Sequence, residues 1–283
     1  GSEISNEQAT ATPKVVYFWY TVWTAVAGEA VKLQFKSEGT GTVGADQITM
    51  VAINLSDDLT ENTDWFFNEN TADTTLAATY GTANSASITF TPNGSDDWLV
   101  LSTALLDPTS LTALQKTRIN AAGGVTDTGV EWMQVAQDAT DDRLVQTLAK
   151  VYTPTAVSTT FKTESESSSA TGTRLYNSVF ALNLNKFNVH AFQATQAEIN
   201  LDTTNAFATS TNIATTSITP TVTGDVWGLG FAIYDTGSTG EPIRYRLQVD
   251  DVDQPGTQTA DFYGQVESTF VTDELPFVVQ TIE

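Results

Sequence analysis

Apolar and polar residues alternate along several stretches of this chain. Residues 31–36 read Val-Lys-Leu-Gln-Phe-Lys, and residues 243–249 read Ile-Arg-Tyr-Arg-Leu-Gln-Val. Because successive side chains of a β-strand point to opposite faces, these stretches predict strands with one face in a core and one in solvent. Residues 99–101 and 180–182 are apolar throughout and predict more fully buried strands.

The chain carries one pattern twice. Residues 35–38 (Phe-Lys-Ser-Glu) return as 161–164 (Phe-Lys-Thr-Glu), and 51–55 (Val-Ala-Ile-Asn-Leu) return as 180–184 (Phe-Ala-Leu-Asn-Leu). The longest match needs no gap, because each of its residues recurs 128 positions later (220 − 92 = 128). Its preserved positions include Pro92, Asp97, Asp107 and Arg118, which return as Pro220, Asp225, Asp235 and Arg246. A period this long is a whole domain, since solenoid units have about 20–50 residues.

Two stretches carry weaker helical signals. Residues 111–118 could form a helical turn, and residues 141–151 begin with two aspartates and continue with leucines. Homologous repeats share their architecture, and the first stretch aligns with the alternating residues 244–247, so we expect a strand there. The second aligns with residues 273–276, where a proline would break a helix interior. A short helix stays open for residues 141–151.

Many short strands separated by turns, in a repeat of this size, are typical of a β-sandwich. We therefore expect an all-β protein with two tandem homologous β-sandwich domains, each resembling a jelly roll. Residues 1–13 are polar and aperiodic and are expected to form a flexible arm. The first sandwich is expected to span residues 14–151 and the second residues 152–283, packed together because no Gly/Ser linker separates them.

Charge and composition narrow the classes of partner. The 283 residues carry a net charge of −22, which repels nucleic acid and anionic membranes, so we expect neither as a partner. No apolar run reaches the length of about 20 residues that spans a bilayer. The absence of cysteine excludes disulfides and thiolate metal sites, and the single histidine, His190, excludes histidine clusters.

The carboxylates are numerous but lie in adjacent pairs. Asp96–Asp97 and similar neighbours do not provide the two carboxylates about 5–10 Å apart across a cleft that glycoside hydrolysis requires. No Gly-x-Ser-x-Gly elbow accompanies His190, so no catalytic residues are assigned. The run Asp250, Asp251 and Asp253 could bind Ca²⁺, which prefers several oxygen ligands from one loop, although the first repeat has no acidic equivalent.

Clustered aromatic residues are the strongest binding candidates. They are Tyr17, Trp19, Trp23, Trp65 and Phe66. Such rings can fill the space between sheets, anchor a protein interface or stack on sugars, and the sequence leaves these three alternatives open.

The positions that both repeats preserve suggest folding roles. Asp97 and Asp225 come before a strand and are expected to fix a turn through hydrogen bonds to the backbone. Asp107 and Arg118, with Asp235 and Arg246, are expected to form a structural ion pair.

Residues 88–92 (Ile-Thr-Phe-Thr-Pro) are followed by Asp97, an apolar strand and Asp107, and residues 246–251 read Arg-Leu-Gln-Val-Asp-Asp. This pattern resembles repeats in virion structural proteins of tailed bacteriophages. The likeness covers about a third of each repeat. It departs at Ile218, where the pattern has Phe, and in the first copy, which ends Arg118-Ile119-Asn120 without the acidic residue of the pattern. The resemblance implies a β-sandwich building block of a virion and no catalytic residues.

We accordingly expect a non-enzymatic structural protein of a virion: a capsid decoration, a fibre or a tail component. It would be a homo-oligomer on an extracellular particle, with other virion proteins or copies of itself as partners. Two alternatives stay open, an adhesive carbohydrate-binding module that is secreted or on a cell surface and a glycoside-active enzyme. No cofactor is expected apart from the Ca²⁺ considered above.

Overall fold

The computed structural model describes one set of residues in full and a second set by its backbone alone. Side chains and backbone are described for residues 20–24, 30, 52–55, 58–81, 83–109, 114–126, 144–168, 172–187, 189–192 and 219. The backbone alone is described for residues 131–135, 226–230, 242–243, 248–249, 252–253, 262–263, 266–267, 271–272 and 279–282. The expected N-terminal arm, residues 1–13, lies outside both sets.

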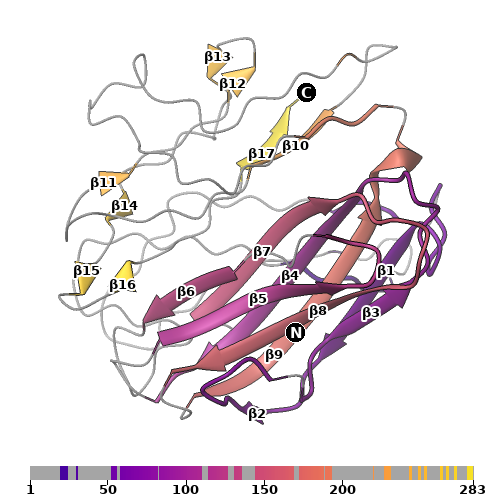
Figure 1. Ribbon diagram of the computed structural model, residues 1–283. Coiled ribbons are helices and arrows are strands. Elements are labelled where there is room, and N and C mark those ends of the chain that lie inside the picture. Colours follow the sequence, from indigo (N-terminus) through magenta and orange to yellow (C-terminus); the bar gives the residue numbers. More distant parts are fainter. Residues whose placement is uncertain are drawn as a thin grey trace.

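Two antiparallel sheets stack face to face (Figure 1). The first has the order β1 (Trp65–Asn70), β9 (Thr173–Asn183), β4 (Trp98–Asp107) and β7 (Leu144–Tyr152), and the short β2 (Thr74–Thr75) also pairs with β9. The second has the order β3 (Ser87–Phe90), β8 (Thr159–Ser167), β5 (Leu114–Ala122) and β6 (Glu131–Val135). A 3-10 turn, Leu184–Lys186, follows β9. The described part of the chain is thus all-β, as the sequence predicted.

Alternation along the strands places the core between the sheets. In β5, residues 115, 117, 119 and 121 are buried, and the side chains between them are only partly covered. The inter-sheet cluster includes Phe90, Ile119 and Phe161 from the second sheet and Trp98, Val100 and Val179 from the first. Each Å² of apolar surface that is buried between the sheets contributes about 25 cal/mol to the stability of this contact.

The first sheet is buried on its outer face as well. Leu99, Leu101, Phe180 and Leu182 point away from the second sheet and form a separate cluster with Trp65. Tyr20, Val22, Leu55 and Leu59 pack against this cluster, and the Tyr20 hydroxyl donates to the Leu101 carbonyl at 2.9 Å. Burial on both faces explains why β4 is apolar at every position except Ser102, Thr103 and Asp107.

The short helix left open for residues 141–151 is not formed by the described part of that stretch. Residues Leu144–Tyr152 form β7, which pairs antiparallel with β4 from Leu106↔Leu144 to Trp98↔Tyr152. Tertiary pairing overrides a local helical preference here, because β7 buries apolar residues on both faces of the sheet. The strand expected near residues 111–118 is confirmed as β5 (Leu114–Ala122).

The sandwich takes strands from both sides of the expected domain boundary. β7 runs through residues 151–152, and the strands that follow it return to the earlier ones. β8 pairs with β3 and β5, and β9 pairs with β1 and β4. One structural unit therefore extends from β1 to β9, and its strands do not separate at residue 151.

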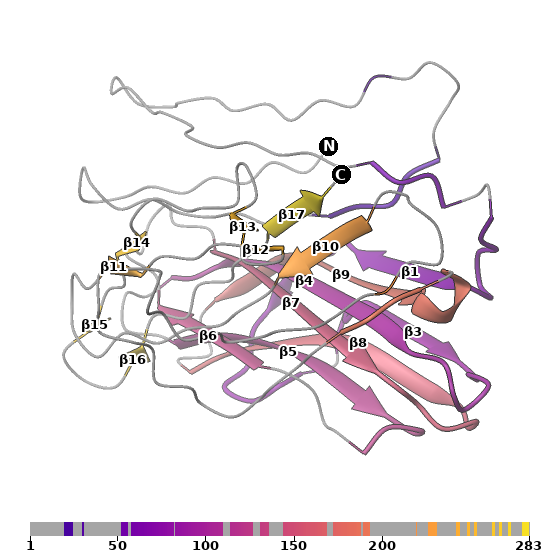
Figure 2. The same cartoon turned by 90° about the horizontal axis from the view of Figure 1, so that it is seen from above.

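Beyond β9 the structure shows four further antiparallel strand pairs (Figure 2). These are β10 (Val226–Gly230) with β17 (Val279–Ile282), β11 (Pro242–Ile243) with β14 (Phe262–Tyr263), β12 (Gln248–Val249) with β13 (Val252–Asp253), and β15 (Val266–Glu267) with β16 (Val271–Thr272).

Two of these strand pairs join residues that correspond, in the sequence repeat, to residues paired in the sandwich. Leu114↔Val135 and Gln115↔Gln134 join β5 to β6, and Pro242↔Tyr263 and Ile243↔Phe262 join β11 to β14. All four residue numbers rise by the period of the sequence repeat (242 − 114 = 128; 263 − 135 = 128). β10 pairs with β17 as β4 pairs with β7, since Trp98↔Tyr152 corresponds to Val226↔Ile282 (226 − 98 = 128; 282 − 152 = 130).

Within the described residues, no helix combines the length and the apolar character needed to cross a membrane.

Candidate functional site

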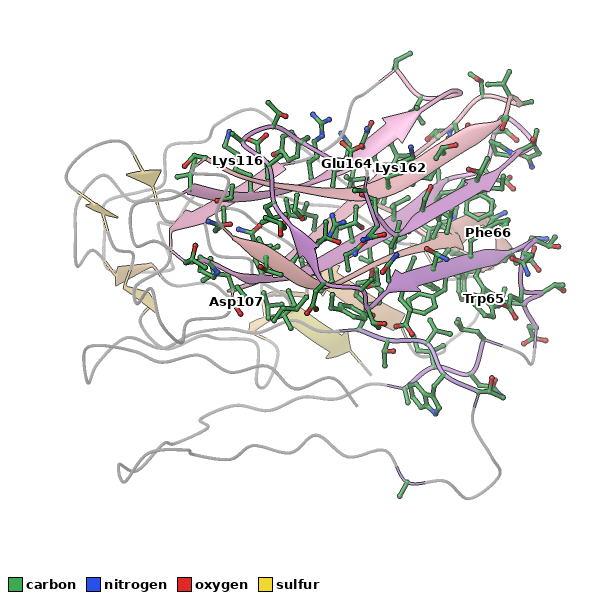
Figure 3. The ribbon with its side chains drawn as sticks, turned by 90° about the horizontal axis from the view of Figure 1, so that it is seen from below. Trp65, Phe66, Asp107, Lys116, Lys162 and Glu164 are labelled. Carbon is green, nitrogen blue, oxygen red and sulfur yellow. The ribbon has the colours of Figure 1, made fainter. Side chains whose placement is uncertain are left out.

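The aromatic residues of β1 lie on opposite faces of their sheet. Trp65 is 7% exposed in the outer-face cluster, with its ring centroid 6.5 Å from that of Phe180. Phe66 faces the second sheet and stacks on Phe90 at 4.3 Å, next to Trp98. Both residues lie at the end of the molecule opposite Asp107 (Figure 3). Of the remaining candidates, Trp23 is 42% exposed, and Tyr17 and Trp19 lie outside the described residues.

A hollow of about 750 Å³ opens at this end of the sandwich, between β1 and β3. Phe66, Phe67 and Phe90 contribute aromatic surface to its wall. Asn68, Asn93, Asp96, Asn183 and Lys186 contribute amide, carboxylate and ammonium groups. The indole nitrogen of Trp98, which also lines the hollow, is buried without a hydrogen-bond partner among the described residues. Such a mixture of rings and amides suits a polyhydroxylated ligand better than a purely apolar one.

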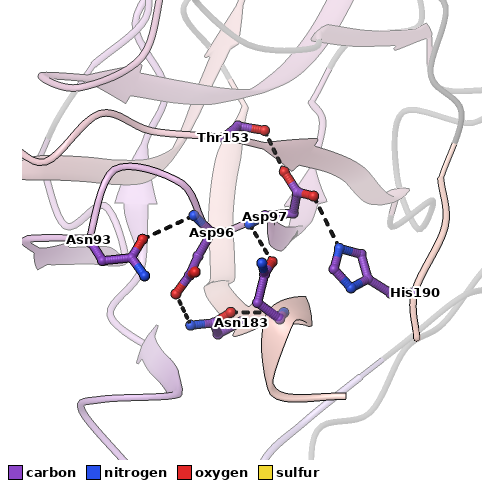
Figure 4. A network of polar contacts seen from close by, with 7 residues as sticks. Asn93, Asp96, Asp97, Thr153, Asn183 and His190 are labelled. Atoms are coloured by element: carbon purple, nitrogen blue, oxygen red, sulfur yellow. Dashed lines mark hydrogen bonds and ion pairs between the residues drawn. The ribbon is translucent and has the colours of Figure 1, made fainter. Parts of the chain in front are cut away.

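The rim of the hollow is fixed by a network of polar contacts (Figure 4). The Asn93 side-chain oxygen accepts from the backbone N–H groups of Ser95 and Asp96, which stabilises the turn between β3 and β4. Asp96 accepts from the Asn183 amide at 2.7 Å, and the Asp97 N–H donates to the Asn185 side chain at 2.8 Å. The turn is therefore held against the end of β9.

The Asp97 side chain holds two other segments. It accepts a hydrogen bond from the Thr153 hydroxyl at 2.5 Å, and its second oxygen lies 3.0 Å from His190 Nε2. The expectation that Asp97 fixes a turn through the backbone is corrected, because Asn93 makes those bonds. Asp97 instead joins residues far along the chain, and no sequence spacing signals such a contact.

Asp64 forms an ion pair at the edge of the hollow. Its Oδ1 lies 2.9 Å from Lys186 Nζ, and its Oδ2 accepts from the Thr60 N–H at 2.9 Å. Burial by itself raises the pKa of Asp64, but the hydrogen bonds from Lys186 and Thr60 and the Lys186 charge outweigh it and lower the pKa. The hydrogen bond to Asp64 also raises the pKa of Lys186.

A second charged cluster lies on β5 and β8. Arg118 donates to Glu164 Oε2 from Nε at 3.0 Å and from Nη2 at 2.7 Å, and Asn120 donates to Oε1 at 2.7 Å. The expected pairing of Arg118 with Asp107 is corrected, because β8 places Glu164 directly opposite Arg118. Glu164 and Arg118 both belong to the repeated pattern, as Glu38 and Arg246.

Arg174 is a buried cation between the sheets. It is 1% exposed, and its guanidinium donates to the Ala83 carbonyl at 2.6 Å. Burial lowers the pKa of Arg174 to about 10, and the charge of Glu164 acts in the opposite direction. Hydroxyl and amide side chains, including Ser102, Thr163 and Gln115, surround this half of the interface. The interior thus has its larger apolar cluster at the Trp98 end, whereas the Arg174 end combines buried polar side chains with a smaller apolar cluster that includes Leu106.

The remaining expected positions are placed only in part. Pro92 is buried, and Asp107, at the end of β4, pairs with Thr173 of β9. Pro220, Asp225, Asp235 and Arg246 lie outside the described residues. So do Asp250 and Asp251, and for Asp253 only the backbone, in β13, is described. Among the described side chains, no group of three or more acidic or histidine residues is arranged to hold a metal ion.

In comparisons with known proteins, no family model matches the chain, and no curated sequence matches it.

Proposed function

We propose that this protein is a non-enzymatic structural protein of a virion, serving as a capsid decoration, a fibre or a tail component. It acts through protein–protein assembly, with other virion proteins or with copies of itself as partners. The order of the strands in the two sheets carries this proposal.

The strand order supports a jelly roll. With the two-residue β2 set aside, the described unit has four strands in each sheet, ordered β1-β9-β4-β7 and β3-β8-β5-β6. The chain crosses repeatedly from one sheet to the other, as the two Greek keys of a jelly roll require. Jelly rolls form capsid and lectin domains, so the fold raises the expectation of a virion or glycan-binding role by analogy.

The repeated strand pairs support a second, tandem sandwich. β11–β14 recurs at the period of the sequence repeat relative to β5–β6. β10–β17 corresponds to β4–β7, with β10 at the same period and β17 two or three residues further along. Strand pairing is a long-range property that a short sequence match does not by itself produce. Two homologous units in one chain would offer two equivalent sets of surfaces for assembly.

The contacts of the repeated positions support a structural role. Asp97 is held by Thr153 and His190, and Arg118 is held by Glu164. Each of these groups is engaged in joining strands and turns. Positions retained in both repeats therefore maintain the fold, which is what a building block requires.

Fractionation of virus particles tests this function. Virus particles are collected from the environment in which the gene occurs, treated with nuclease and separated by density-gradient centrifugation. Tryptic peptides of this chain are then quantified in each fraction. We expect the peptides to co-purify with the major capsid protein through repeated density gradients. Release of the peptides from the particles on partial disassembly would identify the protein as a decoration protein and not as part of the capsid shell. Recovery only in cell membranes or in the soluble fraction would overturn the proposal.

The hollow beside Phe66 favours a second candidate function, the binding of glycans. Sugars stack on aromatic rings and hydrogen-bond to amides and carboxylates, and both kinds of group line this space. A glycan array with the wild-type chain and with Phe67→Ala tests it, and Val157→Ala, at a residue that is 50% exposed, is the control. Glycan binding is supported if the wild type and Val157→Ala bind an arrayed glycan and Phe67→Ala does not, although its melting temperature is unchanged. If the wild type gives no signal above background, binding is excluded for the glycans on the array.

A further inference from the structure

The second sheet ends at β3, and among the described strands β3 pairs with β8 alone. The other edge of β3 faces β1 of the first sheet, because the Ser87 N–H donates to the Asn68 side chain of β1 at 3.1 Å. An unpaired strand edge is a row of backbone donors and acceptors on which another strand can form. The free edge of β3 is therefore a place where this sheet can be extended.

The pairing with β8 fixes which backbone groups point outward. The Thr163 N–H donates to the Ala86 carbonyl, so the backbone of Ala86 faces β8. Along an antiparallel strand, such positions alternate with positions whose backbone groups point away from the partner. Ser87 and Thr89 are positions of the second kind. Asn68 accepts from the Ser87 N–H, and the N–H and carbonyl of Thr89 point in the same direction, where no described strand lies.

The hollow of about 750 Å³ follows this edge. Residues 87–93 line it without a break, and so do the successive residues 66–68 of β1. Because successive side chains of a strand point to opposite faces, a space on one face of a sheet touches every second residue. A space that touches all of them lies beside the backbone. The hollow is therefore bounded by the edges of both sheets, on the side of the sandwich where β1 and β3 lie (Figure 1).

A space beside a strand edge suits an extended polypeptide. A peptide that adds to a sheet gains affinity from main-chain hydrogen bonds and specificity from the places its alternate side chains occupy. The outward N–H and carbonyl of Thr89 offer such bonds. Phe67 and Phe90 offer apolar surface beside them, and both belong to the wall of the hollow.

The charges around the hollow favour a basic occupant. Its wall contains two carboxylates, Asp64 and Asp96, and one ammonium group, Lys186. Lys186 lies 2.9 Å from Asp64, whereas Asp96 accepts from the neutral amide of Asn183. The whole chain carries a net charge of −22, so a second copy is repelled on approach and a segment rich in lysine or arginine is attracted.

We propose that the free edge of β3 and the hollow beside it form a docking site for an extended, basic segment of a partner protein, which adds to the second sheet as a further strand. The backbone of this segment pairs with Thr89, and one of its cationic side chains lies beside Asp96. The inference rests on the assembly role proposed above and names the surface and the kind of partner for it.

A pair of synthetic peptides tests whether binding uses the backbone. The probe is a fluorescent nine-residue peptide of alternating threonine and lysine, titrated into the full chain and followed by anisotropy. A second peptide has the same sequence and charge, but N-methyl groups on its three central residues remove backbone donors along both of its edges. We expect the methylated peptide to bind about tenfold more weakly. Equal affinities, or no binding of either peptide, would overturn the proposal.

Variants of Thr89 locate the site. Thr89→Pro removes the N–H that points into the hollow and keeps the bonds to β8, which come from the alternate residues. Thr89→Ala is the matched control, because both variants lose the hydroxyl contact with Thr160 at 2.8 Å and only proline loses the donor. We expect about tenfold weaker peptide binding by Thr89→Pro and no change in Thr89→Ala. Equal binding by the two would overturn the proposal, and if Thr89→Pro does not fold, the two peptides decide by themselves.

A further pair of variants tests the charge. Asp96→Asn is expected to weaken binding of the lysine-containing peptide about threefold. Asp73→Asn, at an exposed carboxylate outside the hollow, removes the same charge from the chain and is expected to leave the affinity unchanged. Equal losses in the two variants would show that the peptide responds only to the net charge, which contradicts docking beside Asp96.

Other occupants of the hollow give different results. Sedimentation of the full chain without peptide would show a dimer that Thr89→Pro dissociates and Thr89→Ala does not if a second copy occupies the edge, which overturns the choice of a basic partner. Binding of an arrayed glycan by a chain that does not bind the peptide assigns the hollow to sugars and also overturns it.

The docking site and the virion role fail in different ways. Equal affinities for the two peptides reject strand addition at β3 and leave the virion role untouched. Absence of the chain from purified particles rejects the virion role and does not affect the peptide result.

Discussion

Arg118 and Glu164 lie directly opposite each other on β5 and β8, with Arg118 Nη2 2.7 Å from Glu164 Oε2. The carboxylate is almost fully buried, while the arginine side chain is 36% exposed and its guanidinium lies 4.0 Å from the centroid of the Tyr80 ring. Asn120 satisfies the second carboxylate oxygen. This contact joins two residues that are 46 positions apart in the sequence, so it favours the pairing of β5 with β8.

The pairing predicts a strong effect of removing the cation. Arg118→Met leaves the Glu164 carboxylate buried without its charged partner, and we expect the free energy of unfolding to fall by about 1–3 kcal/mol. Urea denaturation at neutral pH measures the loss. In the Arg118→Met/Glu164→Gln variant, part of this loss should be recovered, because the buried side chain at position 164 then carries no charge that needs Arg118. Simple addition of the two single losses would show that the residues are not coupled.

The backbone conformation of Gly123 predicts that a side chain at this position destabilises the fold. Its φ is +98°, in the left-handed region, and a Cβ there would collide with the Ser158 carbonyl. We expect Gly123→Ala to lower the unfolding free energy by at least about 2 kcal/mol, because both the strain and the collision must be relieved. Gly81→Ala is the control, since a Cβ at Gly81 meets nothing within 4 Å. Equal midpoints for the two variants in thermal unfolding would contradict this account.

Asp64 predicts a pH dependence in acid. Its folded pKa is lowered, so the stability it contributes is present above the unfolded pKa of about 3.9 and is lost as the pH falls through the folded pKa. We expect the difference in melting temperature between the wild type and Asp64→Asn to shrink as the pH falls below about 4. Lys186→Met should reduce the same difference, because Lys186 supplies one of the hydrogen bonds and the charge. A difference that stays constant across this range would show that Asp64 does not titrate with folding.

The burial of Phe161 predicts how much the core between the sheets contributes to the free energy of unfolding. Its side chain is fully buried on β8, with its ring centroid 4.9 Å from that of Tyr152 and 6.0 Å from that of Phe90. We expect Phe161→Ala to lower the free energy of unfolding by about 3–5 kcal/mol through lost contacts and the cavity left behind. Val157→Ala, at an exposed position, should change it by less than about 0.5 kcal/mol. Guanidinium unfolding followed by tryptophan fluorescence distinguishes the two, and a small effect at Phe161 would mean that the sheets are not closely packed there.

Local patterns were sufficient for many elements of the fold. The apolar runs 99–101 and 180–182 lie inside β4 and β9, and the alternation expected near residue 115 is present in β5. These features depend on neighbours in sequence, which is why a single sequence contains them.

Long-range contacts were beyond the reach of local patterns. Residues 144–151 have a helical distribution of leucines, yet they form β7 because pairing with β4 at the end of the sheet buries residues 144–148 on both faces. Asp97 reaches Thr153 and His190, and Arg118 reaches Glu164 and not Asp107. The hollow beside Phe66 likewise draws its wall from β1, β3, the start of β4 and the end of β9. No spacing along the chain signals any of these sets.

The sequence by itself determined that this protein is all-β, acidic and internally repeated, because alternation, charge and a constant offset can be read residue by residue. Only the tertiary structure decided which strands are neighbours, and it placed β8 and β9 beside strands of the other repeat. The physical reason is that a strand's hydrogen bonds and its buried face are satisfied by whichever partners the packed sheets bring beside it, however far away they are in the chain.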